Sequence, residues 1–256
     1  PRVKLLFFMR KTMSLAVAGL PPVSIKIINF MRHLLFCLLG GLFFCCSETI
    51  DPDPSLVGYD YFPLEIGFYR TYQVNEITIS LLDPTDTSRY QRRELVADTF
   101  HTQNETNYVL HLFSRKTDLD SWNLDSVWTA RRTETHAVVV ENNVPFLKLV
   151  FPVRQNKTWD GNLFNALPED EYEITEIGGG FDTPAGRFED LLTVFENDNP
   201  DTLIFQDIRQ AIYAPNVGLI YQKSSILNYC NTDPGCLGTL ESGKQFDQIL
   251  IDFGYE

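Results

Sequence analysis

The sequence predicts a mainly β protein: a single antiparallel curved sheet, half-barrel or barrel-like, with few or short helices. Segments that alternate apolar with polar residues, or that are rich in β-branched and aromatic residues, recur about every ten to fifteen residues from Tyr59 onward. Turn residues separate these segments, among them Asn142-Asn143, Gly178-Gly179-Gly180, Pro184-Ala185-Gly186 and Pro215-Asn216. No stretch shows the apolar spacing of an amphipathic helix of about twelve residues or more. These observations favour an antiparallel sheet that curls around one core.

The expected strands follow one another along the last two hundred residues. In order, they lie within residues 69–82, 107–117, 121–132, 135–143, 145–153, 158–164, 171–198, 201–230 and 244–256. The first of these changes its alternating face near Glu76-Ile77, which predicts a bulge. Asp160-Gly161 is typical of a two-residue hairpin turn. A short helix within residues 187–197 stays open as an alternative.

The charge is distributed unevenly along the chain. Residues 1–45 carry six basic residues and no acidic one; because the chain has 21 basic and 34 acidic residues, the remainder has 15 basic against 34 acidic, a formal balance of −19. Such a domain is repelled by nucleic acid and by anionic membrane surfaces. The sequence therefore predicts no nucleic-acid partner, and the change of charge marks a processing boundary.

An apolar run precedes this boundary. Residues 34–44 are apolar, follow Arg32 and end at Cys45 and Cys46. A helix of this length covers about half of a ~30 Å hydrocarbon core, so the run is too short to span a membrane but matches a signal peptide. The motif "LFFCCSE" resembles the lipobox of bacterial lipoproteins, which implies lipid attachment at Cys46, with Cys45 as the alternative. A signal peptide cleaved without lipidation and a buried segment stay open as alternatives.

Four segments result from this division. Residues 1–30 are expected to be an upstream start-site artefact or an extended leader, and residues 31–45 a lipoprotein signal peptide. Residues 46–58, with two Asp-Pro steps, are expected to be a lipid-anchored tether, and residues 59–256 a β-rich globular domain.

Two cysteines remain in the globular domain. Cys230 and Cys236 enclose five residues with an Asp-Pro-Gly turn, which favours a disulfide in an oxidising compartment. A zinc site would need further ligands nearby, and the sequence offers none close by. Motifs for nucleophilic, metal-dependent or phosphate chemistry are also missing, so we predict no catalytic residue, no metal, no cofactor and no enzyme activity.

Aromatic residues make up 13% of the chain, and many lie on expected strands. They could form a face that binds an apolar ligand; the residues selected for this face are Phe68, Tyr72, Trp122, Trp128 and Tyr213. A packed core made by the same side chains is the alternative.

The segments "DTPAGRFEDLLTVFE" and "IYAPNVGLIYQ" follow a TPAG-x-F … YA-x-x-VG-x-I pattern. The matching residues are Thr183, Pro184, Ala185, Gly186, Phe188, Tyr213, Ala214, Val217, Gly218 and Ile220. This last third of the chain resembles uncharacterised periplasmic half-barrel domains similar to the LolA/LolB lipoprotein carriers, and "YDYFPLEIGFYRTYQV" resembles the opening strand of Bacteroidetes cell-envelope lipoproteins. The resemblance implies a half-barrel that binds an apolar ligand, and it supplies no catalytic residue.

Together these observations predict a lipid-anchored protein of the cell envelope, at the outer membrane and facing the periplasm or the cell surface. Its expected function is non-enzymatic binding or carrying of an apolar ligand. The alternative is a structural or interaction component of an outer-membrane or surface complex, with a protein partner.

Overall fold

The structure is a computed structural model, and it describes residues 57–81, 85–102 and 105–256. The predictions for the signal peptide at 31–45, the lipid attachment at Cys46 or Cys45, and residues 1–30 lie outside the described residues, as does most of the tether. They remain predictions.

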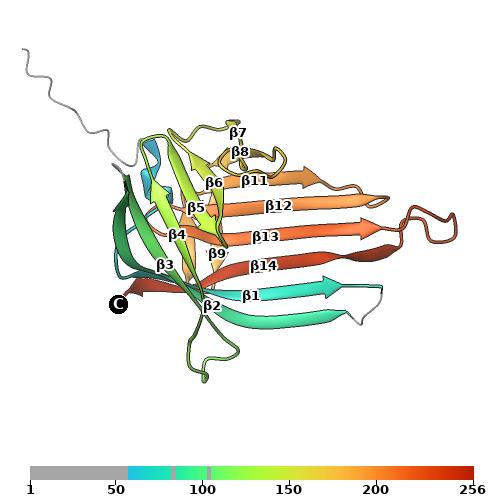
Figure 1. The fold of residues 1–256 in the computed structure, drawn as a ribbon, viewed down its shortest axis with the longest axis horizontal. Helices are drawn as coiled ribbons and strands as arrows, with labels where there is room; N and C mark the ends of the chain where they lie inside the picture. The colour runs from blue at the N-terminus through green and yellow to red at the C-terminus, as the bar shows by residue number, and fades with distance from the viewer. Residues whose placement is uncertain (1–56, 82–84, 103–104) are drawn as a thin grey trace, which may run out of the picture. The chain divides into compact units, whose positions relative to one another are not determined.

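The regular structure of the described part is almost entirely β, as predicted (Figure 1). It begins with a short 3₁₀ helix, η2 (Tyr59–Tyr61), and continues with β1 (Phe68–Ile79), β2 (Asp86–Thr102), β3 (Glu105–Arg115), β4 (Asn123–Arg132), β5 (His136–Glu141), β6 (Val144–Val150), β7 (Thr158–Asp160), β8 (Glu171–Ile177), β9 (Gly180–Thr183), β10 (Gly186–Glu189), β11 (Leu192–Asn199), β12 (Phe205–Ala214), β13 (Gly218–Tyr229) and β14 (Leu240–Tyr255).

Twelve strands form one antiparallel sheet in the order β6-β5-β4-β3-β2-β1-β14-β13-β12-β11-β8-β7. The two ends of this sheet meet. The Leu147 amide of β6 donates to the carbonyl of Gly161, just after β7, at 2.9 Å, and the Trp159 indole of β7 donates to the Leu147 carbonyl at 2.9 Å. The sheet is therefore a nearly closed, barrel-like structure, which confirms the predicted fold class.

Several turns lie where the residue types predicted them. Asn142 and Asn143 join β5 to β6 with φ of 50° and 68°, and Asn216 lies between β12 and β13 with φ of 62°. Asparagine tolerates this left-handed region because its short side chain can hydrogen-bond to the local backbone.

Four local features differ from the predictions. β2 was missed, because its many charged residues obscure the strand pattern. β1 has no bulge at Glu76-Ile77; the register shift of this pairing lies at Thr71/Tyr72, where Ile251 of β14 is the extra residue. A ten-residue connection, 161–170, follows Asp160 in place of a tight hairpin, because Asn162 and Asn165 organise a longer turn through side-chain hydrogen bonds to Pro168 and Pro145. Residues 187–197 contain β10 and β11, so a helix there was wrong.

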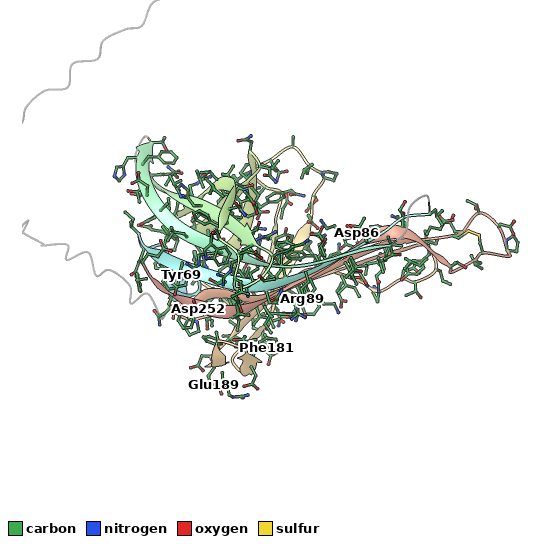
Figure 2. The ribbon with its side chains drawn as sticks, turned by 90° about the horizontal axis from the view of Figure 1, so that it is seen from below. Tyr69, Asp86, Arg89, Phe181, Glu189 and Asp252 are labelled. Carbon is green, nitrogen blue, oxygen red and sulfur yellow. A yellow bond between two sulfur atoms is a disulfide. The ribbon has the colours of Figure 1, made fainter. Side chains whose placement is uncertain are left out.

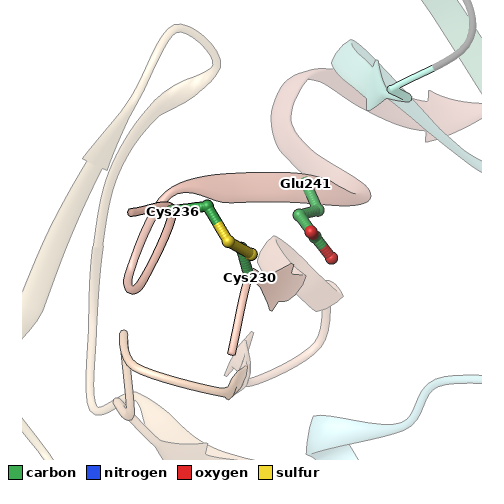
Figure 3. A group of neighbouring side chains, drawn as sticks. All are labelled: Cys230, Cys236 and Glu241. Carbon is green, nitrogen blue, oxygen red and sulfur yellow. A yellow bond between two sulfur atoms is a disulfide. The ribbon is translucent and has the colours of Figure 1, made fainter. Parts of the chain in front are cut away.

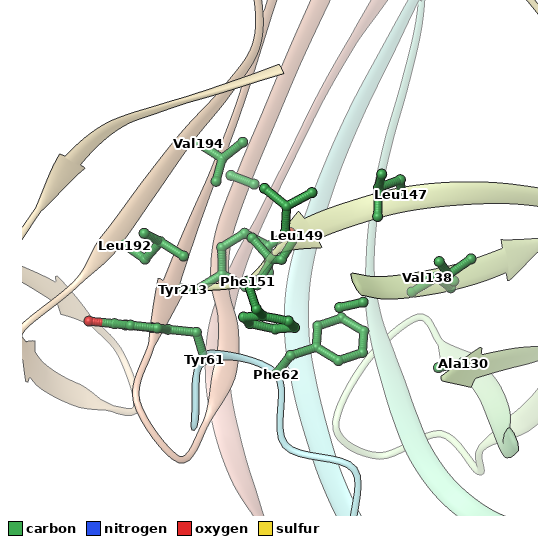
Figure 4. Close-up of a cluster of buried hydrophobic side chains, with 14 of the residues drawn as sticks. Tyr61, Phe62, Ala130, Val138, Leu147, Leu149, Phe151, Leu192, Val194 and Tyr213 are labelled. Atoms are coloured by element: carbon green, nitrogen blue, oxygen red, sulfur yellow. The ribbon is translucent and has the colours of Figure 1, made fainter. Parts of the chain in front are cut away.

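The main core fills the curl of the sheet, as Figure 4 shows. Side chains from η2, β4, β5, β6, β8, β11 and β12 converge there, and several are fully buried: Ala137, Val138, Leu147, Leu149, Ile174 and Leu192. Phe62, next to η2, packs into the same cluster, so the segment before β1 helps to cover one end of the barrel.

A small second sheet, β9–β10, packs on the outer face of the long strands (Figure 2). Its Phe181 ring lies 5.2 Å from the ring of Tyr221 on β13, and its Phe188 ring lies 5.8 Å from that of Phe253 on β14. These contacts close a second, smaller hydrophobic cluster. The predicted turns at residues 178–180 and 184–186 are the two ends of this hairpin.

Five strands continue beyond the barrel as a flat layer, visible on the right of Figures 1 and 2. We call this part the extension; it comprises residues 75–79, 86–90, 205–209, 223–229 and 240–247. In it, only Asp207, Ser225 and Leu227 are buried. The disulfide loop 230–236 lies at its end.

Candidate functional site

A cavity of about 240 Å³ lies inside the curled part of the sheet. Its apolar wall includes Phe62, Leu64, Leu110, Leu112, Trp128 and Phe246, and its charged wall consists of Arg70, Arg92, Glu94, Glu141, Lys148 and Glu196. The interior is therefore not purely apolar: three basic and three acidic side chains share it with aromatic and aliphatic groups.

Arg70 and Glu94 form the first charged pair, across β1 and β2. The Arg70 Nη2 group donates to Glu94 Oε1, and its Nη1 group donates to the Val217 carbonyl at 3.1 Å. Residue 218 must be a glycine here, because its φ is 84° and a Cβ would collide with the Arg70 guanidinium. Burial by itself would lower the pKa of Arg70, but Glu94 raises it by more, so Arg70 is a cation at neutral pH.

Lys148 and Glu141 form the second pair, on β6 and β5, with 2.9 Å between Nζ and Oε1. Burial would lower the pKa of Lys148, but Glu141 and Glu196 raise it above its ordinary value. Glu196 on β11 is 6% exposed, and burial raises the pKa of its carboxyl despite the nearby Lys148. Burying a charge is costly unless it is paired, which explains this direction.

Both Lys148 and Glu196 are the extra residues of β-bulges. In the β5–β6 ladder, Ala137 pairs with Leu149 and Val138 with Leu147, so Lys148 is left over. In the β11–β12 ladder, Phe195 pairs with Gln210 and Asn197 with Arg209, so Glu196 is left over. Bulges redirect a side chain relative to the regular alternation, and here both bulge residues line the cavity.

Tyr213 on β12 interacts electrostatically with both charged pairs, since it raises the pKa of Arg70 and of Lys148. Burial, followed by Glu196, raises the pKa of its own hydroxyl. Tyr72 is also buried and donates to the Leu219 carbonyl at 2.9 Å. Both tyrosines are therefore neutral hydrogen-bonding groups in the cavity wall.

Two buried donors of the cavity residues are unsatisfied. The Nε–H of Arg70 and the indole Nε1–H of Trp128 have no hydrogen-bond partner among the described residues. A buried donor without a partner costs about 1–3 kcal/mol, so such groups are rare in a finished core. At the wall of a cavity, they are suited to a ligand that brings hydrogen-bond acceptors.

The predicted aromatic face is partly assembled here. Tyr72, Trp128 and Tyr213 line the cavity. Phe68 is buried elsewhere, with its ring 5.2 Å from that of Tyr255. Trp122 lies between the guanidinium groups of Arg93 and Arg115, at 4.8 and 4.2 Å from its ring, and does not line the cavity.

The six charged cavity residues were not predicted from the sequence. One signal was available: Lys148 interrupts the apolar run "PFLKLVF", where a cation on a buried strand needs an internal partner. Among the described residues that line the cavity there is no histidine, cysteine or serine. The cavity lining offers charged and hydrogen-bonding groups beside aromatic and aliphatic side chains.

Cys230 and Cys236 are joined by a disulfide, with 5.6 Å between their Cα atoms (Figure 3). Glu241 lies beside them, and one ligand-type atom from each of the three residues falls within 4.8 Å of the others. Zinc binds cysteine as a thiolate, and the sulfur atoms of a disulfide are not thiolates. This cluster is therefore a covalent link in the extension and not a metal site in this oxidised form.

In residues 57–81, 85–102 and 105–256, no helix has the length and apolar character needed to cross a membrane.

No family model matches this chain, and no curated protein sequence matches it. The chain is similar to two solved structures. One is a candidate exported protein with a YmcC-like fold from Bacteroides fragilis NCTC 9343, with 12% identity and a TM-score of 0.44 over 75% of this chain and 98% of that one. The other is a candidate lipoprotein from Parabacteroides distasonis ATCC 8503, with 10% identity and a TM-score of 0.39 over 76% and 98%.

Proposed function

We propose that this protein is a lipid-anchored protein of the cell envelope that binds a small amphipathic ligand inside its curled sheet. The observation that carries the proposal is the cavity, in which buried donors on Arg70 and Trp128 lack partners among the described residues. A ligand with hydrogen-bond acceptors would satisfy them, which makes binding favourable. The proposed role is binding without catalysis.

The size of the cavity sets the size of the ligand. A volume of about 240 Å³ is smaller than the roughly 300–1,000 Å³ of sites for drug-sized molecules. A phospholipid with two acyl chains does not fit into it. The sequence-based expectation of an apolar ligand is therefore narrowed to a small molecule with one apolar part.

The lining sets the chemistry of the ligand. Trp128, Phe246 and the leucines 110 and 112 offer an apolar surface, whereas the charged wall requires polar groups. An entirely apolar ligand would cover the charged groups without satisfying them, which is costly. An amphipathic ligand satisfies both parts of the wall.

Native mass spectrometry of the full chain, purified in detergent from an envelope extract, tests the proposal. We expect a small molecule to remain bound. Ala130→Leu, which fills part of the cavity from β4, should abolish its retention. Val127→Leu on the same strand, where residue 127 is 54% exposed, is the matched control and should retain it. A bare protein, or a ligand retained equally by Ala130→Leu, would contradict the proposal.

The anchor is tested separately. We expect metabolic lipid labelling of the protein and its loss in Cys46→Ala. If labelling survives this change and is lost in Cys45→Ala, the modified residue is Cys45. If labelling is absent from the wild-type protein, the protein is not lipid-anchored.

A second candidate function is that of a component of an envelope complex. It is favoured by apolar side chains near the disulfide loop: Leu203, Ile204 and Leu237 are 59%, 54% and 60% exposed. Cross-linking in intact cells through a photoreactive residue at position 237 tests it. A single defined protein adduct would support this candidate, and its absence would leave the cavity as the functional site.

A further inference from the structure

The charged cavity residues fall into two groups on different parts of the sheet. Arg70, Arg92 and Glu94 lie on the neighbouring strands β1 and β2, and Glu141, Lys148 and Glu196 lie on β5, β6 and β11. β3 and β4 separate the first group from β5, and β12, β13 and β14 separate it from β11. The two groups therefore belong to different walls of the cavity.

In the first group, one cation is left over. Glu94 neutralises Arg70, whereas Arg92 forms no ion pair with the described residues. The Arg92 guanidinium donates to the Tyr90 hydroxyl at 3.0 Å and to Gln248 Oε1 at 3.5 Å, and it stacks on the ring of Phe246 at 5.6 Å. Arg70 adds a further donor to this group, since its Nε–H has no partner among the described residues.

In the second group, one acid is left over. Two cations act on Glu196, and both have other partners: Lys148 pairs with Glu141 at 2.9 Å, and Arg209 pairs with Asp170 at 2.7 Å and with Asp207 at 2.8 Å. Glu196 itself forms no ion pair and accepts no side-chain hydrogen bond among the residues that the structure describes. Glu196 is nevertheless 6% exposed. A buried carboxyl group without a donor is costly unless something else supplies one.

We propose that the ligand is dipolar: an anionic or acceptor-bearing end bound by Arg92, Arg70 and Trp128, and an amine end bound by Glu196, with an apolar segment between them. This rests on the proposed function and names the ligand class of the same site. The unpaired cavity charges are one cation and one acid, so a dipolar molecule neutralises both. A ligand with a single charge leaves the other protein charge buried and unpaired, which is unfavourable.

The raised pKa of Glu196 agrees with this assignment. Burial favours the protonated form of this carboxyl group more than the nearby Lys148 and Arg209 favour the ionised form, and Glu141 and Asp170 also favour the protonated form. An ammonium group at hydrogen-bond distance favours the ionised form. Ligand binding should therefore release a proton when the solution pH lies near the raised pKa.

Isothermal titration calorimetry of the full chain with three probes tests the inference. The probes are 6-aminohexanoate, hexanoate and hexylammonium, which share an apolar chain and differ in their charged ends. We expect 6-aminohexanoate to bind at least about tenfold more tightly than either of the others.

Two variants test the contribution of each end of the ligand separately. Glu196→Gln should weaken 6-aminohexanoate and hexylammonium about tenfold and leave hexanoate unchanged. Arg92→Gln should weaken 6-aminohexanoate and hexanoate and leave hexylammonium unchanged. The matched controls are the exposed Glu171→Gln on β8 and Arg89→Gln on β2, which should change no affinity. Near-UV circular dichroism checks that each variant is folded.

The outcomes separate this inference from the proposed function. If hexanoate or hexylammonium binds as tightly as 6-aminohexanoate, or if both variants affect all three probes equally, the dipolar ligand is overturned while a small-molecule site stands. If no probe binds and native mass spectrometry shows a retained ligand whose mass identifies it as carrying one charge or none, the dipolar ligand is again overturned. If no probe binds and the protein is bare, both proposals fail.

Discussion

The barrel-like end and the extension are built from the same five long strands, yet they differ in almost every physical property. In the barrel, the inner face of these strands is covered by the rest of the sheet and encloses the core and the cavity. In the extension, most side chains are partly or fully exposed, and three residues of its five segments are buried. An alternating strand pattern alone therefore does not bury side chains. The curl of the sheet and the elements that cover it bury them.

One ion pair from each region shows how differently exposed such pairs are. The barrel holds ion pairs with little exposure, such as Arg70–Glu94, whose side chains are 9% and 19% exposed. The extension has the Lys244–Glu76 pair at 3.0 Å, whose side chains are 55% and 25% exposed. Solvent screens the second pair and is largely excluded from the first.

Removing one partner from each pair should give the largest difference in stability between the two regions. Arg70→Met leaves Glu94 uncompensated in the cavity wall and should lower the free energy of unfolding by about 3–5 kcal/mol. Lys244→Met in the extension should cost about 0–1 kcal/mol. Urea unfolding of both variants measures this. Adding Glu94→Gln to Arg70→Met should recover part of the loss; if it recovers nothing, the loss does not come from the unpaired charge.

Truncating an aliphatic side chain in each region should give the next largest difference. Leu147 on β6 is fully buried, so Leu147→Ala should cost about 2–5 kcal/mol. Ile226 on β13 is 37% exposed, so Ile226→Ala should cost clearly less, about 1 kcal/mol or below. Comparable losses in urea unfolding would mean that the extension has a core of its own.

Removing the disulfide should show whether the extension opens separately from the barrel. Replacing both Cys230 and Cys236 with serine should cost about 2 kcal/mol according to the loop-entropy account. Because the bond lies at the end of the extension, hydrogen exchange should accelerate in residues 223–229 and 240–247 and stay unchanged in β5 and β6. Uniform acceleration over both regions would show that they unfold as one unit.

The smallest expected effect concerns the pH dependence of the barrel. The pKa of Glu196 is raised from its ordinary value of 4.5, so the folded state binds this proton more tightly than the unfolded chain. Its stabilising contribution is fully present below pH 4.5 and is lost as the pH rises through the raised pKa.

Glu196→Gln stays neutral and should lose nothing over this range. As the pH rises from about 4 to about 8, the free energy of unfolding of the wild type should therefore fall relative to that of the variant. Glu171→Gln, on an exposed part of β8, should run parallel to the wild type. A constant difference between Glu196→Gln and the wild type would contradict the raised pKa.

Local chemistry made much of the fold predictable. Turn residues such as Asn142, Asn143 and Asn216 have the left-handed backbone that their residue types allow. The spacing of Cys230 and Cys236 predicted a short covalent loop, and the structure contains it. These features depend on neighbours in the sequence, and a sequence shows such neighbours directly.

The charged half of the site could not be predicted in this way. Lys148 and Glu196 are bulge residues, and a bulge is fixed by the partner strand, which lies elsewhere in the sequence. β2 was missed because Arg92 and Glu94 stand at positions that face the cavity and thus break the apolar alternation. Of the predicted aromatic face, Trp122 lies in the loop before β4 and stacks between Arg93 of β2 and Arg115 of β3, outside the cavity lining.

The pairing of β1 with β14 has a consequence for how the protein is made. Twelve residues of β1 are in register with residues 243–255, so the strand that starts the sheet is bound by the one synthesised last. The chain between β1 and β14 forms a long loop, and contacts between residues so far apart in sequence form slowly. β1 and β14 cannot pair before residues 240–255 have left the ribosome. In this strand order, β1 has no partner on one of its sides until β14 has been synthesised, so the two halves of the sheet are joined late.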